Sequence, residues 1–461
     1  MKEILSYKYI LPLLILFFYL FFFSSNLISN EIVGFLLFGF VLLRLVYISV
    51  NQIPIKEIFL LILIIQYFIA PSVVYNKFDN DVGDFGYEMK IYKEEYFYFI
   101  IGTIISVLIG LYIPLSRNKI ESSKLFNRLA SAKDNFKIGL ILLIIGFLSH
   151  LINPLLPSSL AFLGLFLSNL KYIAAFYIYF SNNKKKYIYI SIVITYLVLN
   201  IISGGVFIDL FIWGLFFATY FIINKKISLL IKFSAILLGV FTALLIQSIK
   251  ADYRKEIWVE DRNEEIKEEE MFINLTSTKL QNATTIFDEA NTKAFFSRLN
   301  QGWILSNVLE HVPKNQDFSN GDLFIRELQG IILPRIIAPN KITASGKDVK
   351  DKFIKYTGRI LLGNTTMNIG IIADGYINFG TYGCWYFMFF IGLFLNFYIK
   401  TLYKIATNYP TIVLWLPVLF FYVIRTANDF YMVMNYLVKS SILLAAVVYL
   451  FRNKFYKPQL E

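Results

Sequence analysis

Long apolar runs recur through the whole chain, and they constrain its fold more than any other feature. A helix needs about 20 apolar residues to cross the hydrocarbon core of a bilayer. Runs close to that length lie at about 9–25, 31–49, 57–75, 95–115, 138–153, 159–180, 187–203, 206–223, 228–249, 381–400, 411–425 and 431–450. We therefore predict an all-α polytopic membrane protein with about 12 transmembrane helices.

The composition agrees with this fold class and excludes several kinds of site. The 461 residues are 57% hydrophobic and only 16% charged, whereas soluble domains are about 25% charged. The single cysteine, Cys384, excludes an intramolecular disulfide and a cysteine metal cluster. The two histidines, His150 and His311, lie far apart in the chain, so we predict neither a metal site nor a cofactor. The run at 9–25 lacks a small-residue cleavage site, and we interpret it as a membrane anchor.

The charges between the apolar runs predict the orientation of the chain. Lysine and arginine concentrate in the cytoplasmic loops of membrane proteins. With a cytoplasmic N-terminus, the connections on that side include the basic segments 117–137, 184–186, 225–226, 400–404 and the tail after 451. The opposite connections are short or acidic, as in 76–94. We therefore predict that both termini lie in the cytoplasm.

One long connection, residues 250–380, is called here the large loop. It separates an N-terminal membrane bundle, residues 1–249, from a C-terminal one, residues 381–461. Between Lys250 and Arg359 the large loop carries 17 basic and 17 acidic residues, which cancel. The net charge of +12 therefore comes from the rest of the chain and reflects membrane topology, not a nucleic-acid partner. The same orientation places the large loop outside the cytoplasm.

Most of the large loop has the composition of an ordered, partly helical segment. Residues 294–312 carry apolar side chains at helical spacing and end at Pro313, so we predict a helix there, and a shorter one at 348–356. The acidic run 261–270 is typical of a solvated helix or a flexible stretch. Near the end of the loop, glycines permit tight turns at Gly370, Gly375, Gly380 and Gly383.

Three segments of the large loop carry a family resemblance. They read SRLNQGWILSNVLEHVP at 297–313, GIILPRIIAPNK at 330–341 and GIIADGYINFGTYG at 370–383. On a multi-span chain with a late extracytoplasmic loop, these segments resemble the oligosaccharide repeat-unit polymerases of bacterial surface polysaccharide assembly. This family, also called O-antigen or Wzy-type polymerases, belongs with the O-antigen ligases to a group of multi-span, GT-C-like glycosyltransferases.

The resemblance implies an activity and a location. The protein would polymerise polyprenyl-pyrophosphate-linked oligosaccharide repeat units into a surface polysaccharide, by glycosyl transfer that needs no metal, on the outer side of the bacterial cytoplasmic membrane. Its partners would be the lipid-linked oligosaccharide, the lipid bilayer, and a chain-length regulator and a flippase of the same pathway.

The lipid-linked donor implied by the resemblance carries a pyrophosphate, which needs fork-like cationic donors, and arginine suits that role. We therefore expect the substrate to be bound by Arg298, Arg326, Arg335, Arg359, Arg425 and Tyr376. Each arginine is also consistent with an ordinary solvated side chain. Arg425 is also placed to form an interfacial salt bridge with Asp429, four residues on.

The acceptor hydroxyl needs a base or an orienting acceptor. Glu327 and Asp374 are the candidate carboxylates, and Asp374 lies in an apolar stretch, so we expect it to face protein or a wet cavity. His311, at the end of the predicted 294–312 helix, is a third candidate, although that position also suits a capping or surface histidine. Two lysines near the middle of predicted spans, Lys171 and Lys439, are consistent with function or with snorkelling.

Other functions fit parts of the same pattern. An O-antigen ligase would transfer the finished chain to a different acceptor, and the sequence hardly separates it from a polymerase. A lipid-linked oligosaccharide flippase would fit twelve spans, but not a large ordered loop or the absence of duplicated halves. A conventional multi-span glycosyltransferase would need an acidic pair in the first external loop, which here holds one carboxylate, so the pair would have to be Asp79 and Asp81 in the second.

Overall fold

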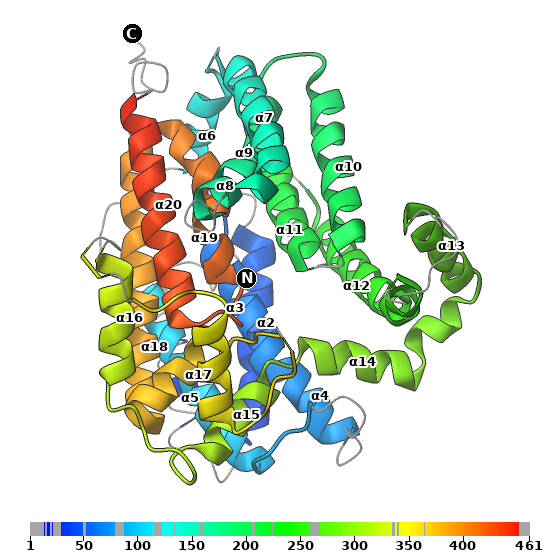
Figure 1. The fold of residues 1–461 in the computed structure, drawn as a ribbon. Helices are drawn as coiled ribbons and strands as arrows, with labels where there is room; N and C mark the ends of the chain where they lie inside the picture. The colour runs from blue at the N-terminus through cyan, green and yellow to red at the C-terminus, as the bar shows by residue number, and fades with distance from the viewer. Residues whose placement is uncertain are drawn as a thin grey trace.

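The computed structural model shows an all-helical protein over the residues that it describes (Figure 1). These are residues 13, 16–18, 21 and 29–450, except for 49–51, 79–86, 115–121, 133, 157–160, 205–207, 224, 226, 258–267, 334–336, 339–340 and 364. The predicted anchor at 9–25 and most of the acidic run 261–270 therefore lie outside the described residues.

Ten described helices lie before the large loop, and an eleventh, α12, begins before the loop and ends within it. Their bounds are α2 Asn30–Ile48, α3 Ile55–Ile64, α4 Ala70–Lys77, α5 Lys93–Tyr112, α6 Ser122–Ala130, α7 Asn135–Ile152, α8 Ala161–Ser168, α9 Leu170–Tyr179, α10 Lys186–Gly204 and α11 Ile208–Ile222, followed by α12 Leu229–Ile257. A π-helical turn, Ile65–Ile69, joins α3 to α4 without a break.

The large loop and the C-terminal part of the chain supply the remaining helices. Those of the loop are α13 Glu268–Gln281, α14 Glu289–Leu299, α15 Gly302–His311, α16 Asp322–Ile332 and α17 Lys347–Thr357. Those after it are α18 Ile371–Ala406, α19 Leu416–Ile424 and α20 Phe430–Leu450, and the 3₁₀ turns Asn153–Leu155, Ala283–Phe287 and Pro410–Trp415 complete the described helical structure.

Within the described residues, eight segments are long and apolar enough to cross a membrane, as a polytopic membrane protein requires. They are Asn30–Ile48, Ile55–Lys77, Lys93–Tyr112, Asn135–Leu155, Phe162–Tyr179, Leu229–Ile249, Ile371–Ala406 and Phe430–Tyr449. Three shorter apolar helices, Lys186–Asn200, Asp209–Ile222 and Pro410–Ile424, coincide with three more predicted runs. The predicted all-α class with many apolar helices is thus confirmed. Of the twelve predicted spans, eight correspond to described helices that are long and apolar enough to cross a membrane.

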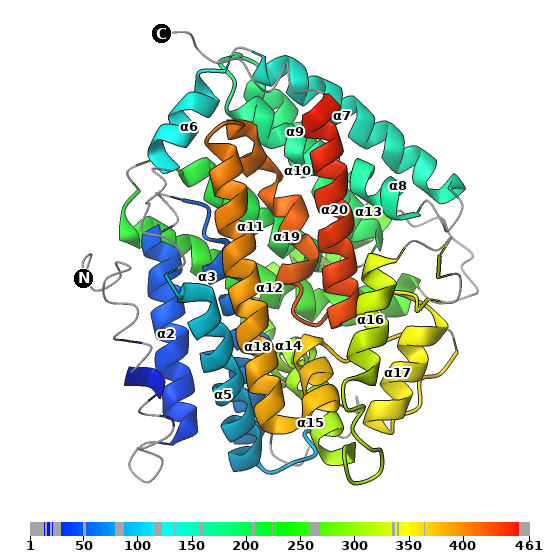
Figure 2. The same cartoon turned by 90° about the vertical axis from the view of Figure 1, so that its left-hand side faces the viewer.

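Glycines allow a close helix contact where α5 packs along α18 (Figure 2). A Cβ atom at Gly110 would lie 2.2 Å from the carbonyl oxygen of Phe389, and one at Gly392 would lie 2.3 Å from that of Val107. Without a hydrophobic driving force between helices in lipid, such close backbone approach is what small residues contribute to helix association.

Of the two helices predicted in the large loop, one differs from its prediction and one agrees with it. The single helix expected at 294–312 is wrong, because the chain breaks between α14 and α15, where the Asn300 side chain accepts a hydrogen bond from the Trp303 N–H (3.1 Å). The helix expected at 348–356 is confirmed by α17.

The predicted glycine turns are confirmed only in part. Gly370 has a φ of 88° just before α18, and Gly380 has a φ of 69° at a kink inside it. Gly375 and Gly383 are helical instead, because α18 already begins at Ile371. The segment after Gly370 is therefore the start of a long helix rather than a chain of turns.

The helices of the large loop gather against the first part of α18. Figures 1 and 2 show α15, α16 and α17 beside this part of α18, at the end of the molecule opposite the C-terminus. The beginning of α20 meets α16 there. This junction brings loop side chains next to the starts of two apolar helices.

Candidate functional site

Four charged side chains meet where the large loop joins α18 and α20. The Nζ atom of Lys352, on α17, lies 2.7 Å from Glu327 Oε1 on α16 and 2.5 Å from Asp374 Oδ1 on α18. It also lies 3.5 Å from Oδ2 of Asp429, the residue before α20. These four residues are called here the Lys352 cluster, and they connect four separate helices through one ammonium group.

The two aspartates of the cluster also tie α18 and α20 together at their starts. Asp374, in the first turn of α18, accepts a hydrogen bond from the N–H of Phe430, the first residue of α20 (2.7 Å). Asp429, just before α20, accepts one from the N–H of Gly370, just before α18 (2.9 Å). N–H groups at helix starts lack partners within their helix and carry positive partial charge. The negative charge of Asp374 is therefore stabilised at the start of α20, and that of Asp429 at the start of α18.

The Lys352 cluster is almost completely removed from solvent. Glu327 and Asp374 are each 1% exposed and Asp429 is 4% exposed, while the Lys352 side chain is 10% exposed. Buried charges are costly unless they are paired. The Lys352 ammonium group pairs with all three carboxylates of the cluster, which makes Lys352 the central residue of the junction.

Burial and pairing shift the two loop members of the cluster in defined directions. Burial lowers the pKa of Lys352, but the charges of Asp374, Asp429 and Glu327 outweigh it and raise the pKa well above its ordinary value. Burial raises the pKa of Glu327 despite the nearby Lys352. Its Oε2 atom has no hydrogen-bond partner among the described residues. Lys352 therefore stays charged, and Glu327 holds a proton more readily than an exposed carboxyl group does.

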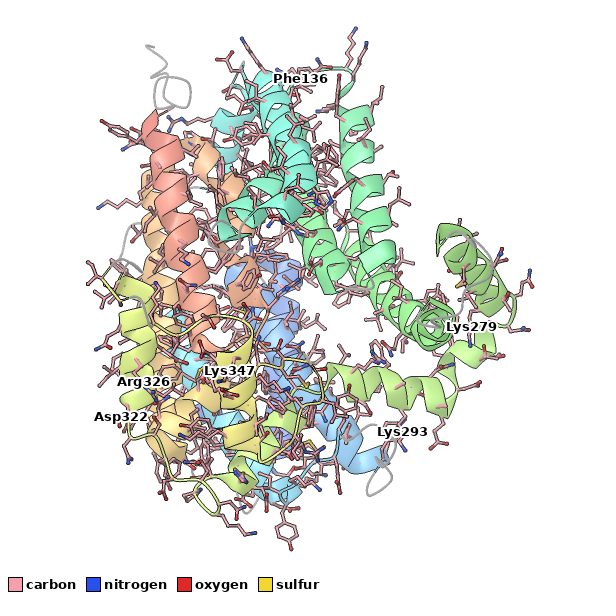
Figure 3. All side chains as sticks on the ribbon, in the orientation of Figure 1. Phe136, Lys279, Lys293, Asp322, Arg326 and Lys347 are labelled. Carbon is pink, nitrogen blue, oxygen red and sulfur yellow. The ribbon has the colours of Figure 1, made fainter. Side chains whose placement is uncertain are left out.

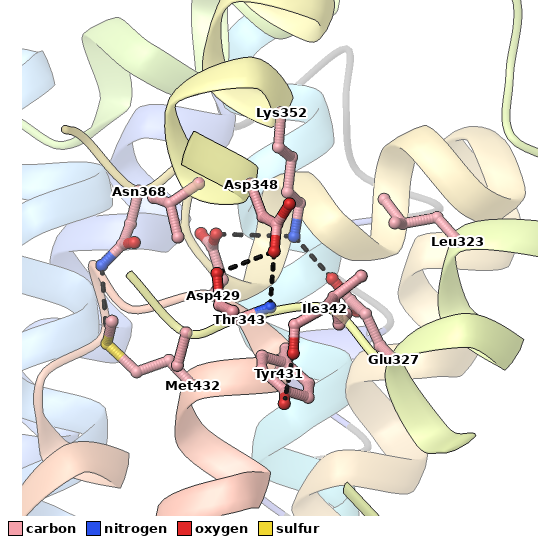
Figure 4. Close-up of a pocket in the computed structure, with 12 residues that line it drawn as sticks. Leu323, Glu327, Ile342, Thr343, Asp348, Lys352, Asn368, Asp429, Tyr431 and Met432 are labelled. Carbon is pink, nitrogen blue, oxygen red and sulfur yellow. Dashed lines mark hydrogen bonds and ion pairs between the residues drawn. The ribbon is translucent and has the colours of Figure 1, made fainter. Parts of the chain in front are cut away.

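A small cavity adjoins the cluster (Figure 4). Its volume is about 60 Å³, and Glu327, Lys352 and Asp429 are among its lining residues. The lining also includes Thr343, whose N–H and hydroxyl both bond Asp348 Oδ2 at 2.7 Å, and Tyr431, whose hydroxyl donates to the Ile342 carbonyl (2.8 Å). Such a cavity has room for a few water molecules or one small polar group. It can therefore admit a hydroxyl group next to Glu327.

The structure brings together two of the three predicted catalytic residues. Glu327 and Asp374 both bind Lys352, as described above. His311 lies at the end of α15, where its ring is next to Asn315 (3.3 Å) and beneath Gly358. Tyr376, predicted to bind substrate, donates its hydroxyl to the Val312 carbonyl (2.9 Å) and is buried. Tyr376 thus fastens α18 to the end of α15.

The predicted arginines lie on separate elements, and Arg335 lies outside the described residues. Arg298 is half-buried on α14, and Arg326 is on the outer side of α16 (Figure 3). Arg425 follows α19 and pairs with Asp209, with its guanidinium 4.6 Å from the centre of the Phe421 ring. The prediction of a salt bridge between Arg425 and Asp429 is wrong, because Asp429 pairs with Lys352 instead.

Among the predicted arginines that lie within the described residues, Arg359 differs from Arg298, Arg326 and Arg425 in lining a cavity. It belongs to a second cavity, together with Trp303 and Phe353. Its Nε atom donates to Asn307 Oδ1 at 2.7 Å.

Two members of the cluster, Lys352 and Asp429, were not among the predicted site residues. A signal for Lys352 exists in the sequence: it stands on the same helical face as Val349 and Tyr356, both buried. A lysine on the apolar face of a short amphipathic helix needs a buried partner. Asp429 was considered only as a salt-bridge partner of Arg425, because the two residues lie four positions apart in the sequence.

Among the described residues, no group of three or more His, Cys, Asp or Glu side chains is arranged to hold a metal ion. The three carboxylates of the Lys352 cluster converge on an ammonium group instead. Fold and site together define a polytopic helical membrane protein with a buried charge cluster where its large loop meets the bundle.

Comparison with known proteins places the chain in a family. The model of a domain of unknown function, DUF8712, matches residues 65–456, which include the whole Lys352 cluster, and the chain belongs to that family. No curated protein and no solved structure matches the chain.

Proposed function

We propose that this protein is a glycosyltransferase that polymerises polyprenyl-pyrophosphate-linked oligosaccharide repeat units on the outer side of a bacterial cytoplasmic membrane. The Lys352 cluster carries the proposal. It is a buried group of carboxylates next to a cavity of hydroxyl size, at the level where the large loop meets apolar helices. A lipid-linked substrate would present its reacting sugar at such a junction.

The proposed reaction assigns the base to Glu327. Burial raises the pKa of Glu327, which makes its carboxylate a stronger proton acceptor than an exposed one. Glu327 would remove the proton of the acceptor hydroxyl as the hydroxyl oxygen bonds to the anomeric carbon of the growing chain. The bond from that carbon to pyrophosphate breaks, and its electron pair leaves on polyprenyl pyrophosphate. Asp374 and Asp429 would hold Lys352, and through it Glu327, in position.

Other parts of the proposal concern topology and binding. The large loop is extracytoplasmic, both termini are cytoplasmic, and the three shorter apolar helices together with residues 9–25 complete twelve spans of a GT-C-like bundle. Arginines of the loop would neutralise the leaving pyrophosphate, and a flippase and a chain-length regulator would act in the same pathway.

Deletion of the gene tests this function directly. We expect the surface glycan of the deletion strain to shrink to a single repeat unit, with full-length polymer restored by the wild-type gene. Lipid-linked polymer that is no longer transferred to its final acceptor would indicate a ligase instead. Repeat units held on the cytoplasmic side would indicate a flippase, and an unchanged polymer would remove the proposal altogether.

A further inference from the structure

A second cavity borders α17, the helix that also carries Lys352. Its volume is about 170 Å³, and its lining residues are Tyr87, Trp303, Phe353, Arg359, Ile360, Leu361 and Met367. Pockets for whole drug-sized ligands measure about 300–1,000 Å³. This cavity therefore suits one ring of a larger ligand whose remainder lies outside it.

Three aromatic rings form one wall of the cavity. The Tyr87 and Trp303 rings meet edge to face, with centroids 5.1 Å apart at 80°. The Phe353 ring stands 6.4 Å from Trp303 at 62°. Trp303 and Phe353 are buried and Tyr87 is half-buried. The wall is therefore rigid and apolar, with Tyr87 closest to solvent.

An arginine is fixed against this wall. The Arg359 guanidinium carbon lies 5.6 Å from the centre of the Trp303 ring, and Arg359 Nε donates to Asn307 Oδ1 (2.7 Å). Asn307 in turn donates to the Trp303 carbonyl (2.6 Å). Since Trp303 and Asn307 are one turn apart on α15, this helix presents the ring and the amide that orients the arginine on the same face.

We propose that this second cavity is a sugar subsite, which holds one pyranose ring of the lipid-linked oligosaccharide while another part of the same molecule lies at the Lys352 cluster. A pyranose has C–H faces that pack on aromatic rings and a rim of oxygens that accept hydrogen bonds. A guanidinium that is held in position is a strong donor to such oxygens. The proposal rests on the function proposed above and adds the site where a sugar of the glycan is recognised.

The position of the cavity fits this role. Lys352 and Phe353 are consecutive residues of α17, one lining the first cavity and the other lining the second. A helix with its side chains is about 10–12 Å across. A short oligosaccharide can span that width, so a ring in the second cavity would set which sugar reaches Glu327.

Binding to the purified full-length chain in lipid nanodiscs tests the subsite. The probe is the oligosaccharide released by mild acid from the lipid-linked repeat units of the source strain, followed by saturation-transfer NMR and by tryptophan fluorescence. We expect Arg359→Ala and Asn307→Ala each to weaken binding about tenfold or more. Tyr87→Leu, at the solvent side of the wall, should also weaken it. The control Lys314→Ala, an exposed cation after α15, should bind as the wild type does.

Several results would overturn the subsite. One is no saturable binding by the wild type, and another is equal affinity in the wild type and in all three cavity variants at unchanged melting temperature. A third is a result in which the cavity variants bind farnesyl phosphate more weakly than the wild type does but bind the oligosaccharide equally well. That result would assign the cavity to the lipid phosphate. These outcomes are separate from the proposed function, because that function stands or falls on the glycan profile of the deletion strain.

Discussion

Lys352 Nζ lies 2.7 Å from Glu327 Oε1, and this contact joins two loop helices next to the starts of α18 and α20. The same ammonium group pairs with Asp374 and Asp429. One cation among three carboxylates therefore helps to hold the large loop against the apolar helices, and its effect on stability can be measured separately from any activity.

The variant Lys352→Met should strongly destabilise the protein. It keeps the length of the side chain but leaves three buried carboxylates without their cation, and breaking a buried ion pair costs about 3–5 kcal/mol. We expect a clearly lower melting temperature for the purified chain in detergent. Lys347→Met changes an exposed lysine on the same helix and should melt like the wild type. Equal melting of both variants would show that the cluster does not hold the junction.

The variant Glu327→Gln should lose activity while keeping the fold. The amide occupies the same space but cannot take up the acceptor proton, and a positioned base contributes about 10²–10⁴-fold to such a reaction. In the deletion strain, this variant should give single-repeat glycan at normal membrane levels. Glu310→Gln, in a surface pair with Lys314, should restore full polymer. Full polymer from Glu327→Gln would remove Glu327 as the base.

Glu327 also gives stability a pH dependence of defined sign. Burial raises its pKa above the ordinary value of 4.5, so the folded chain binds this proton more tightly than the unfolded chain. The stabilisation is complete below pH 4.5 and is lost as pH rises through the folded pKa. Lys352, with a raised pKa, keeps its contribution below 10.5 and does not interfere in this range.

Melting curves recorded at increasing pH from 4.5 measure this effect. The melting temperature of the wild type, relative to that of Glu327→Gln, should fall as pH rises, because only the wild type titrates at this position. A relative melting temperature that instead increases with pH would mean that the Glu327 pKa is lowered.

The sequence predicted the apolar helices well and the site only in part. Apolar runs are local, and length alone marks a segment such as 31–49 as a membrane helix. The Lys352 cluster is not local, because Glu327, Lys352, Asp374 and Asp429 span about a hundred residues of chain. Asp374 was found because it interrupts an apolar stretch, and Glu327 was named only as a candidate carboxylate of the large loop. Their cation was missed because a lysine in a charged helix resembles a solvated one until the packing of α16 against α20 is known.

Helix packing predicts a contrast between two glycines. Alanine at Gly110 would push its Cβ to within 2.2 Å of the Phe389 carbonyl oxygen, whereas Gly214 on α11 has nothing within 4 Å of that position. Gly110→Ala should therefore destabilise the protein by about 1–3 kcal/mol, as overpacking does. Gly214→Ala should be neutral, or stabilising by up to about 1 kcal/mol through helix propensity. Thermal unfolding in detergent measures both, and similar melting of the two variants would refute close packing of α5 on α18.

The single cysteine allows the orientation to be tested with little background. Cys384 is fully buried, so the wild type should resist a membrane-impermeant maleimide. Lys314 follows α15 and Lys185 precedes α10, and Figure 1 shows α15 and the start of α10 at opposite ends of the molecule. With the large loop outside, Lys314→Cys should react in intact spheroplasts, and Lys185→Cys only after the membrane is permeabilised. The reverse pattern would place the Lys352 cluster on the cytoplasmic side, where an externally acting polymerase could not use it.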